Sequence, residues 1–588
     1  PRSTLFPYTT LFRSAFPRTS YARTADGAGD WSVCTTPTPG QPNSGSIFVE
    51  ARQVELPVVD KPSQVFTSPF DVHVDFPAGG TLRYTTDGSV PTLENGAISI
   101  DGNFHITRTS CFRWRTFQEG CVPSNIASRT FLWSEMPIGD SDAQMTVGHL
   151  SLPILSVVSD NRFFFDPMIG VMVQGENGIE GNGVDEPCNW NQEWPRAVSF
   201  AYFNDVDKPD FNDDAIFEIS GAWSRRHHPH PFKLKANKVF GHGKTLDYPF
   251  FDEKPFIRNR TLQMRNGVDT DEGRPAERFK DSFLSYIIRH SGIDVEMQGY
   301  QPVAHFVNGQ YQGVIDMREP NNKHYVFANH GWDEEEIDMF EAEEPDTLIV
   351  TQGDRVAFDR LYHLSFSAAD EQSYALIRQL LDVDEYINYM ALELYIGNND
   401  WIRNNMKWFR HHDGGPFRIV LFDLDAAFNK YGMVSDWLSE NFAGWQMTTL
   451  FFNLLENDSF RRQFIDTYCL MGGSVFRPEL TKRLTGEARD RIENDLRAQG
   501  ESAQFMVDYI DKWLVPYSNS YANFLKKFGL ARLQDAEAYR LHIYGNDEGT
   551  VLMNGLVVPH GEYHGWFFPP MTVEAIAPAG MRFAGWKD

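Results

Sequence analysis

Alternating polar and apolar residues predict short strands over most of the first half of the chain. Between residues 61 and 134 such runs are separated by turn residues, as in "TLRYTTDGSVPT" and "CFRWRTF". A period of two with frequent turns is typical of a small all-β sandwich. Runs of the same kind continue from 150 to 265, among them "LPILSVVS", "RAVSFAYF" and "PFKLKANKVFG". We therefore expect a second group of strands there.

Helical spacing begins at 276–290, where the run "AERFKDSFLSYIIRH" repeats apolar residues every three or four positions. A hairpin follows, with Asn308-Gly309 as its two-residue turn. A second helix is predicted at 382–396 from the run "DVDEYINYMALELY", and Gly397 is expected to end it. Strands and helices thus occur in separate runs, which predicts an α+β protein.

The length of 588 residues exceeds what one hydrophobic core supports, so about three or four domains are expected. The first residues, "PRSTLFPYTTLFRS", look like a translated sequencing adapter, and we expect both natural ends of the protein to lie outside this sequence. The predicted division is an adapter-derived leader at 1–14, a linker rich in Gly, Pro, Ser and Thr at 15–60, a β-sandwich accessory module at 61–134, a core at 150–530 and a partial β repeat at 540–588.

Charge narrows the classes of partner. The chain has 53 Lys and Arg against 80 Asp and Glu, a net charge of −27, which disfavours a general binder of nucleic acid or anionic membrane. No apolar run approaches the roughly 18 residues of a membrane span. The five cysteines form no CxxC pair, so no zinc or dithiol motif is indicated. Cys111 and Cys121 flank neighbouring strand-like runs and could be bridged or free.

Candidate chemistry gathers after the second predicted helix. Asp400 and Asn405 have the spacing D-x-x-x-x-N of a protein-kinase catalytic loop, and Asp423 and Asp425 follow a hairpin within "IVLFDLDAAF". Phosphoryl transfer needs a carboxylate to orient or deprotonate the acceptor, a role for Asp400. It also needs hard oxygen ligands for Mg²⁺, a role for Asn405, Asp423 and Asp425. The structural alternative is that these residues only cap a helix and end a strand.

That alternative has some support, because no His-Arg precedes the Asp and "DLD" stands where a kinase has Asp-Phe-Gly. The order of parts favours catalysis. In "GAWSRRHHPHPFKLK" a turn leads to a strand with Lys233 and Lys235 on one face, and one lysine could hold nucleotide phosphates. A helix, two strands, the link Glu319-Pro320-Asn321, another helix and the Asp/Asn loop follow, as in a kinase.

Several motifs together resemble the CotH kinase family, atypical protein kinases that include spore coat protein H. They are "LPILSVVSDNRFFFDPMIGVMVQG", "SRRHHPHPFKLKANKVFG", "LQMRNG", "RFKDSFLSYIIR", "FVNGQYQGVIDMRE", "GNNDWIRNN" and "IVLFDLDAAF", with the resemblance covering roughly 150 to 530. It implies an atypical protein-kinase-like bilobal core, flanked here by small all-β domains. It also implies a secreted or surface-associated enzyme that uses ATP with Mg²⁺ or Mn²⁺ to phosphorylate protein serine. By residue, it places catalysis at Asp400 and metal ligands at Asn405 and Asp423.

One departure from the family concerns the nucleotide cation. The family often has two lysines before a Ser-Phe, whereas His228-Pro229-His230-Pro231 stands here before Phe232. Lys233 is preferred to Lys235 for the phosphates, with Arg225 as a supplement, and Glu319 is expected beside the cofactor at the link.

The flanking segments carry resemblances of their own. "YTTDGSVPT", Tyr84 to Thr92, resembles a small β domain at the end of chitobiases and hexosaminidases. It implies a spacer or a carbohydrate-contacting module, and the spacer is preferred because the turn needs Asp87 and Gly88 for geometry alone. The end of the chain, with Phe583 and Trp586, resembles a bacterial surface repeat. We expect both flanking units to be removable, because the predicted site lies within the core.

Two other functions remain open. One is a non-catalytic surface or glycan-binding protein with a kinase-like scaffold, against which the joint presence of Asp400, Asn405 and Asp423 argues. The other is metal-dependent phosphoester hydrolysis at Asp423 and Asp425, which would release phosphate without an acceptor protein.

Overall fold

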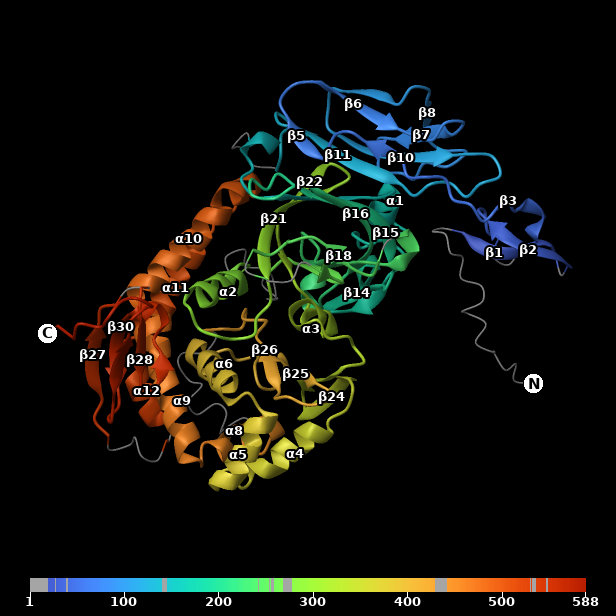
Figure 1. Cartoon of the computed structure of the whole chain (residues 1–588). Coiled ribbons are helices and arrows are strands. Elements are labelled where there is room, and N and C mark those ends of the chain that lie inside the picture. The colour runs from blue at the N-terminus through green and yellow to red at the C-terminus, as the bar shows by residue number, and fades with distance from the viewer. Residues whose placement is uncertain are drawn as a thin grey trace.

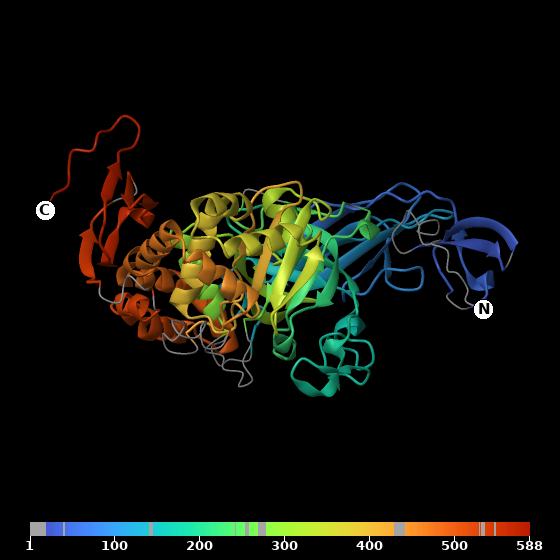
Figure 2. The same ribbon diagram turned by 90° about the horizontal axis from the view of Figure 1, so that it is seen from below.

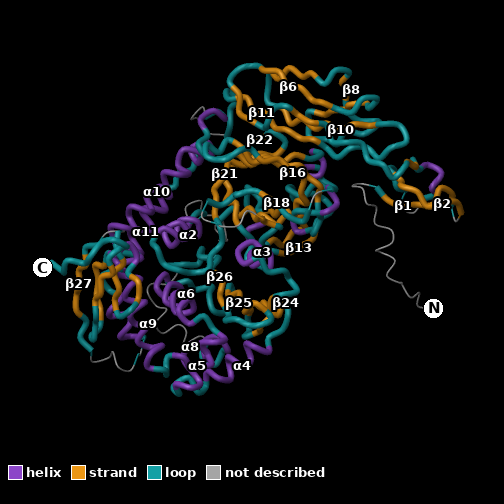
Figure 3. Tube along the Cα trace, in the orientation of Figure 1, coloured by secondary structure: helices purple, strands orange, loops and turns teal. Residues whose placement is uncertain are grey.

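The computed structural model describes residues 19–587 apart from 27, 39–40, 140–144, 242, 253, 255–257, 268–277, 429–441, 529, 531–535 and 546–547. Helices and sheets are both abundant and largely segregated along the chain, so the predicted α+β class is confirmed. The segregation is spatial as well, with most helices in one part of the molecule (Figure 3). Strands from the two ends of the chain lie at opposite ends of an elongated molecule (Figure 2). The adapter-like leader at 1–14 lies outside the described residues.

A closed barrel of seven strands, in the order β12-β15-β16-β17-β20-β22-β21, forms the centre of the first half. Its strands are β12 (Ile154–Val158), β15 (Arg196–Phe203), β16 (Phe211–Ile219), β17 (Phe232–Lys235), β20 (Thr261–Arg265), β21 (Tyr300–Val307) and β22 (Gln310–Arg318). A parallel pairing of β12 with β21 closes the ring of otherwise antiparallel pairs. Asn308 and Gly309 turn between β21 and β22 with positive φ at both positions, as the predicted hairpin requires.

The barrel has an apolar interior and one polar outer face. Phe217, Phe232, Leu234, Leu262 and Met264 are among the buried interior side chains. Because side chains alternate along each strand, the intervening residues point outward. On four neighbouring strands these residues are polar, and cross-strand register puts them on one side; we call them the polar face: Glu218, Lys233, Lys235, Gln263, Arg265, Asp316 and Arg318.

A second sheet, in the order β24-β23-β25-β26, organises the other half. Its strands are β23 (Ile337–Glu343), β24 (Thr347–Gln352), β25 (Met406–His411) and β26 (Arg418–Val420). Helix α6 (Val383–Ile396) packs beside this sheet (Figure 1) and is buried along almost its whole length. It begins after Asp382, whose carboxylate accepts from the Glu385 amide, and ends at Gly397 with φ 62°, so the predicted helix is confirmed.

Apart from the short α1 (Asn161–Phe165), the other described helices pack around the two halves and join them into one core. They are α2 (Lys280–His290), α3 (Lys323–His330), α4 (Val356–Ser365), α5 (Glu371–Leu380), α8 (Gln446–Leu454), α9 (Asp458–Leu470), α10 (Pro478–Leu496), α11 (Gln504–Tyr517) and α12 (Tyr521–Lys527). The long α10 runs beside α2 (Figure 1) and ends at the barrel, where the Asp495 carboxylate accepts from the backbone of Ser151 at 3.0 Å. The described part of α2 agrees with the predicted helix at 276–290.

The predicted sandwich consists of two sheets, β5-β11-β10-β7-β8 and β4-β6-β9. Its strands are β4 (Val58–Val59), β5 (Gln64–Phe66), β6 (Phe70–Asp75), β7 (Thr81–Thr85), β8 (Ala97–Ser99), β9 (Asn103–Ile106), β10 (Ser110–Phe117) and β11 (Ala127–Trp133). It packs on the barrel through the fully buried Arg113, whose guanidinium donates to the Gly88 carbonyl at 3.0 Å and to Ser199 Oγ at 3.3 Å. The Thr130 and Ser156 hydroxyls meet at 2.8 Å across the same interface.

The C-terminal unit is also packed on the core. It contains β27 (Tyr539–Ile543), β28 (Thr550–Met553), β29 (Leu556–Val557), β30 (Tyr563–Phe567) and β31 (Val573–Ile576). The Tyr521 and Tyr563 hydroxyls lie 3.2 Å apart, and a Cβ at Gly473 would come within 2.3 Å of the Tyr563 ring. Removing either flanking unit would expose these buried contacts, so we now expect truncation to destabilise the core.

One detail differs from the sequence-based expectations, and another resolves an alternative that the sequence left open. The predicted linker contains a small sheet of β1 (Ser20–Ala25), β2 (Ala28–Cys34) and β3 (Phe48–Val49), because the alternating runs on either side of its Pro-rich turn outweigh the composition. All five cysteines are buried free thiols, so Cys111 and Cys121 are not bridged. Within the described part of the chain, no helix is long and apolar enough to span a membrane.

Candidate active site

The loop after α6 holds Asp400 with three donors from its own turn. Asn405 donates its amide to Asp400 Oδ2 at 3.1 Å, and Asn404 donates to Oδ1 at 3.2 Å. Arg403 forms an ion pair with the same carboxylate at 3.0 Å. The turn closes tightly because Ile402 and Asn405 adopt positive φ values of 66° and 58°. Asp400 and Asn405 are therefore brought together as predicted, and Asp400 stays one-third exposed, within reach of an incoming group.

The loop after β26 carries Asp423 and Asp425 and is anchored to the N-terminus of α2. Asp281 accepts a hydrogen bond from the Leu424 amide at 3.1 Å, and Lys280 donates to the Ala427 carbonyl at 3.0 Å. Asp423 has φ 64°, a left-handed conformation that is uncommon outside glycine. Such a backbone persists only where its surroundings hold it, here the contacts from α2.

Arg265, which sequence reasoning missed, links this loop to the barrel. From the polar face its guanidinium forms ion pairs with Asp423, with Asp425 at 2.7 Å and with Asp281 at 3.5 Å. Burial alone would lower the pKa of Arg265, but the charges of Asp423, Asp281 and Asp425 outweigh it and raise that pKa. Arg265 is thus a permanent cation between the barrel and the loop.

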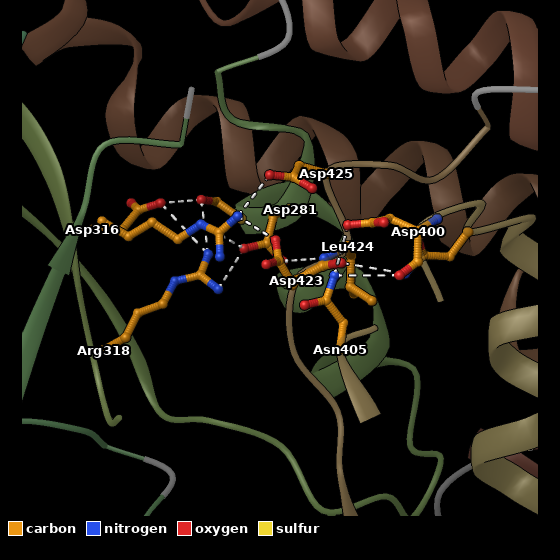
Figure 4. Close-up of polar contacts among 11 residues, drawn as sticks. Asp281, Asp316, Arg318, Asp400, Asn405, Asp423, Leu424 and Asp425 are labelled. Carbon is orange, nitrogen blue, oxygen red and sulfur yellow. Dashed lines mark hydrogen bonds and ion pairs between the residues drawn. The ribbon is translucent and has the colours of Figure 1, made fainter. Parts of the chain in front are cut away.

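A second arginine completes the cluster shown in Figure 4. Arg318 pairs with Asp281 at 2.7 Å and with Asp316 at 3.6 Å. Burial raises the pKa of Asp281, but Arg318 and Arg265 reverse this and keep it below its usual range. Burial raises the pKa of Asp316, with Arg318 opposing. The cluster therefore holds more acids than cations, which favours a further positive charge.

The donor set suits Mg²⁺ or Mn²⁺. Asp423 and Asp425 offer carboxylate oxygens, and Asn405 turns its amide nitrogen towards Asp400, which leaves its amide oxygen as a ligand. Over the described residues, no three His, Cys, Asp or Glu side chains already converge in a metal-binding geometry. Two carboxylates and an amide are enough for Mg²⁺, because this ion usually keeps water and substrate phosphate as ligands.

The position of Arg265 explains why it was overlooked. In a kinase, the strand with the phosphate-binding lysine directly precedes the C-helix and pairs with an acid on it. Among the described barrel strands, the one that precedes α2 along the chain is β20, whereas Lys233 lies on its neighbour in the barrel, β17. The pair of Arg265 with Asp281 on α2 occupies that place. The motif "LQMRNG" before the helix was the available signal.

The two residues after Arg265 fix the turn between β16 and β17. The buried Asn266 donates to the carbonyls of Ser224 at 3.1 Å and His227 at 3.3 Å. Gly267 has φ 73°, and a Cβ there would lie 1.7 Å from the Arg278 carbonyl, so only glycine fits. The turn that faces the site is thus tied to the end of β20.

Lys233 and Lys235 lie on the polar face as predicted, but in different states. Among the described residues, no carboxylate is within ion-pairing distance of the half-buried Lys233 ammonium. Burial, and then the charges of Lys235 and Lys407, lower the pKa of Lys233. Lys235 forms an ion pair with Glu218. Lys233 is therefore the better placed of the two to receive an anion.

Arg225 and Glu319, the other two residues predicted to bind the cofactor, are bonded to other parts of the protein. Arg225 donates its Nε to the Gly221 carbonyl within the β16–β17 turn. Glu319 is 1 % exposed and accepts from the Gly299 amide at 2.7 Å and from Asn329 at 2.8 Å, with Lys254 at 3.1 Å. The Glu319 side chain thus supports the link between the two halves from inside and does not face the site.

A cavity of about 210 Å³ lies beside that link. Its lining comes from the link, the second sheet and α3: Asn321, Asn322, Lys323, Met339, Phe340, Glu341, Thr351, Gln352 and Lys407. The Lys407 ammonium pairs with Glu341 at 3.0 Å. The charge of Lys407 also lowers the pKa of Lys233, so the cavity adjoins the polar face.

A family model described as CotH kinase protein matches residues 217–534, more than half of the chain. The chain belongs to the CotH kinase family. The matched region starts on β16 and includes the polar face, α2, both acidic loops and the helices to α12. The family resemblance seen in the motifs is therefore confirmed.

Comparison with solved structures gives a crystal structure of a Helicobacter pylori proinflammatory kinase, CtkA. It is 10% identical and covers 48% of this chain and 94% of the other, with a TM-score of 0.25. Likeness at that level carries no argument about this CotH family member. No curated protein sequence matches the chain.

Proposed function

We propose that this CotH family member is an ATP- and divalent-metal-dependent protein kinase that phosphorylates serine, or another hydroxyl, of a surface or extracellular protein. The observation that carries the proposal is the meeting of the Asp400 loop with the Asp423 loop, which Arg265 joins to the polar face of the barrel. In this interpretation the barrel is one lobe, the second sheet with its helices is the other, and the link after β22 is the hinge.

Asp400 would orient the acceptor hydroxyl and take its proton. A new bond then forms between the acceptor oxygen and the γ-phosphorus, the bond from that phosphorus to the β-γ bridging oxygen breaks, and ADP leaves. A one-third exposed carboxylate fixed by Asn404 and Asn405 suits this task, because a general base must be both accessible and oriented.

Asp423, Asp425 and Asn405 would hold Mg²⁺ or Mn²⁺, which supplies positive charge to the phosphates when bound. Lys233 lies on the same face of the barrel as Arg265 and would contact the phosphates directly, while Arg265 would hold Asp423 and Asp425 in place. The cavity beside the link would receive the nucleoside, with Lys407 at its inner edge. Lys235, Arg225 and Glu319 would support these groups without contacting ATP, since their side chains are already engaged.

For the flanking units we propose support rather than chemistry, with the core at 150–530 carrying the site. The sandwich at 61–134 packs on the barrel through Arg113, which favours a spacer over a separate carbohydrate-binding module. The family also supports a secreted or surface location and a protein substrate. Neither nucleic acid nor membrane is expected as a partner, in line with the net charge of −27.

The test is incubation of the full chain with labelled ATP, Mg²⁺ or Mn²⁺, and a generic acceptor such as casein. We expect label on serine of the acceptor. Phosphate release without acceptor labelling would favour the phosphohydrolase, with Asp423 and Asp425 as its metal ligands. Absence of nucleotide binding in a thermal-shift assay would favour the scaffold.

A further inference from the structure

Asn398 lies fully buried where the two acidic loops meet. Its Nδ2 donates to the Asp423 carbonyl at 3.2 Å, and its Oδ1 accepts from the Asp400 amide at 3.3 Å. The side chain is 0 % exposed. One amide group thus binds the main chain of the proposed base and of a proposed metal ligand.

Two further links between the described parts of the loops use backbone atoms. The Asn399 amide donates to the Ala426 carbonyl at 3.3 Å, and the Phe428 amide donates to the Ile396 carbonyl at 3.1 Å. These bonds hold the end of α6 against the far part of the Asp423 loop. Asn398 is the side chain that connects Asp400 and Asp423 themselves, and Asn399 is a natural control beside it.

Glu393, one turn earlier on α6, is 0 % exposed and lies beside the Asn398 side chain. Burial raises the pKa of Glu393 well above its usual range, with the Asn398 side chain opposing and the charges of Asp423 and Asp281 adding to the rise. The surroundings of Asn398 therefore disfavour a negative charge, and a neutral amide suits the position.

We propose that Asn398 is a positioning residue for phosphoryl transfer, fixing the acceptor-side Asp400 relative to the metal-side Asp423. Each aspartate is on a separate loop, one after α6 and one after β26, so neither loop alone sets their separation. A misplacement of about 1 Å can cost about 100-fold in rate. The inference deepens the proposed kinase function and rests on it.

The test compares Asn398→Ala with Asn399→Ala in the full chain. Asn398→Ala should lower kcat by about 10- to 100-fold while KM for ATP and the calorimetric affinity for Mn²⁺–ATP stay within about threefold of the original protein. Asn399→Ala, which keeps every backbone bond, should remain within about twofold in kcat. Equal kcat values in the two variants would overturn the proposal, as would a loss of Mn²⁺–ATP affinity in proportion to kcat.

A second variant separates hydrogen bonding from shape. Asn398→Asp is isosteric and keeps the acceptor for the Asp400 amide, but it loses the donor to the Asp423 carbonyl and brings a charge towards Glu393. It should be at least as slow as Asn398→Ala. Full activity of Asn398→Asp would show that only the shape matters and would overturn the proposal. Asn398→Ser takes the place of either variant that does not fold and is judged by the same criteria as Asn398→Ala.

Amide hydrogen exchange supplies a readout that needs no activity. In Asn398→Ala, exchange should accelerate in peptides that cover 398–405 and in peptides that cover 421–428. In Asn399→Ala, exchange should accelerate in neither segment. Acceleration in one loop alone would refute the link. If the original protein binds Mn²⁺–ATP but transfers no phosphate, the kinase proposal fails and positioning for transfer fails with it. The exchange result then decides separately whether Asn398 joins the loops.

Discussion

The two acidic loops of the site are neutralised from opposite sides. Asp400 is held by Arg403, Asn404 and Asn405, all from its own turn. The Asp423 loop is held across the site, by Arg265 from the barrel and by contacts with α2. We infer that the phosphate side of the site is shared by both halves of the molecule, whereas the acceptor side belongs to the half that contains α6. Substitutions in the barrel should therefore affect the binding of nucleotide and metal, whereas substitutions around Asp400 should affect the rate of the transfer step.

The largest expected difference is between the two aspartates. Asp423→Ala removes a metal ligand that water does not replace in charge, so metal-dependent ATP binding and turnover should both be lost. Asp400→Asn keeps the site's shape but removes the base, so Mg²⁺–ATP should still bind while the rate falls by about two to four orders of magnitude. Calorimetry with Mg²⁺ and ATP and a transfer assay measure the two effects. If both variants bind and phosphorylate normally, the kinase interpretation fails.

Arg265 and Arg403, one beside each acidic loop, allow a sharper comparison of the two loops. Arg265→Gln removes the cation shared by Asp423 and Asp425, and should reduce kcat/KM for ATP by about 100-fold or more. Arg403→Gln removes a partly exposed partner of Asp400. Such pairs contribute at most about 1 kcal/mol, so a change of up to about fivefold is expected, in kcat only. Similar losses in both variants would mean that the charges of the two loops are not neutralised separately.

Two lysines on the polar face give a smaller contrast. Lys233→Ala should weaken ATP binding by about tenfold, the contribution of a typical charge-assisted contact. Lys235→Ala should have less effect, because that ammonium already pairs with Glu218. Nucleotide titrations of the two variants under one set of conditions measure this. The reverse order would assign the phosphates to Lys235.

The features that the sequence predicts well are local. Helix α6, its stop at Gly397 and the tight turn that brings Asn405 to Asp400 all depend on residues close together in the chain. Spacing and capping rules describe such features directly. The alternating pattern of β17 likewise predicts that Lys233 and Lys235 share one face of the strand, and the cross-strand register agrees.

What the sequence missed depends on contacts between distant segments. Arg265 gains its place only when β20 inserts between β17 and β22 and the Asp423 loop returns to meet it. The inward orientation of Glu319 depends on Lys254 and Asn329, and no pattern around the link reveals them. Packing of the flanking units on the core was invisible for the same reason.

The smallest expected effect on ATP binding comes from a buried acid in α6, the helix that precedes Asp400. Glu385, in the first turn of α6, is buried with neither carboxyl oxygen bonded. Burial, followed by the charges of Glu296 and Asp382, raises the pKa of Glu385 well above its usual range, and Arg418 only partly opposes this.

A folded-state pKa above the unfolded value means that the folded protein binds this proton more tightly. The stability from Glu385 is then fully present below the unfolded pKa of about 4.3 and is lost as pH rises towards the folded pKa.

Glu385→Gln cannot ionise, so its free energy of unfolding should match that of the original protein near pH 4. Above pH 4 the free energy of unfolding of Glu385→Gln should exceed that of the original protein, by up to about 1.4 kcal/mol for each pH unit. Denaturant unfolding between pH 4 and 8 measures the difference, with Glu371→Gln, on the exposed start of α5, as a control for the substitution itself. A constant difference across this range would contradict a buried neutral acid. Unchanged ATP binding in Glu385→Gln would agree with a helix that supports the acceptor side and leaves the phosphate side to Arg265.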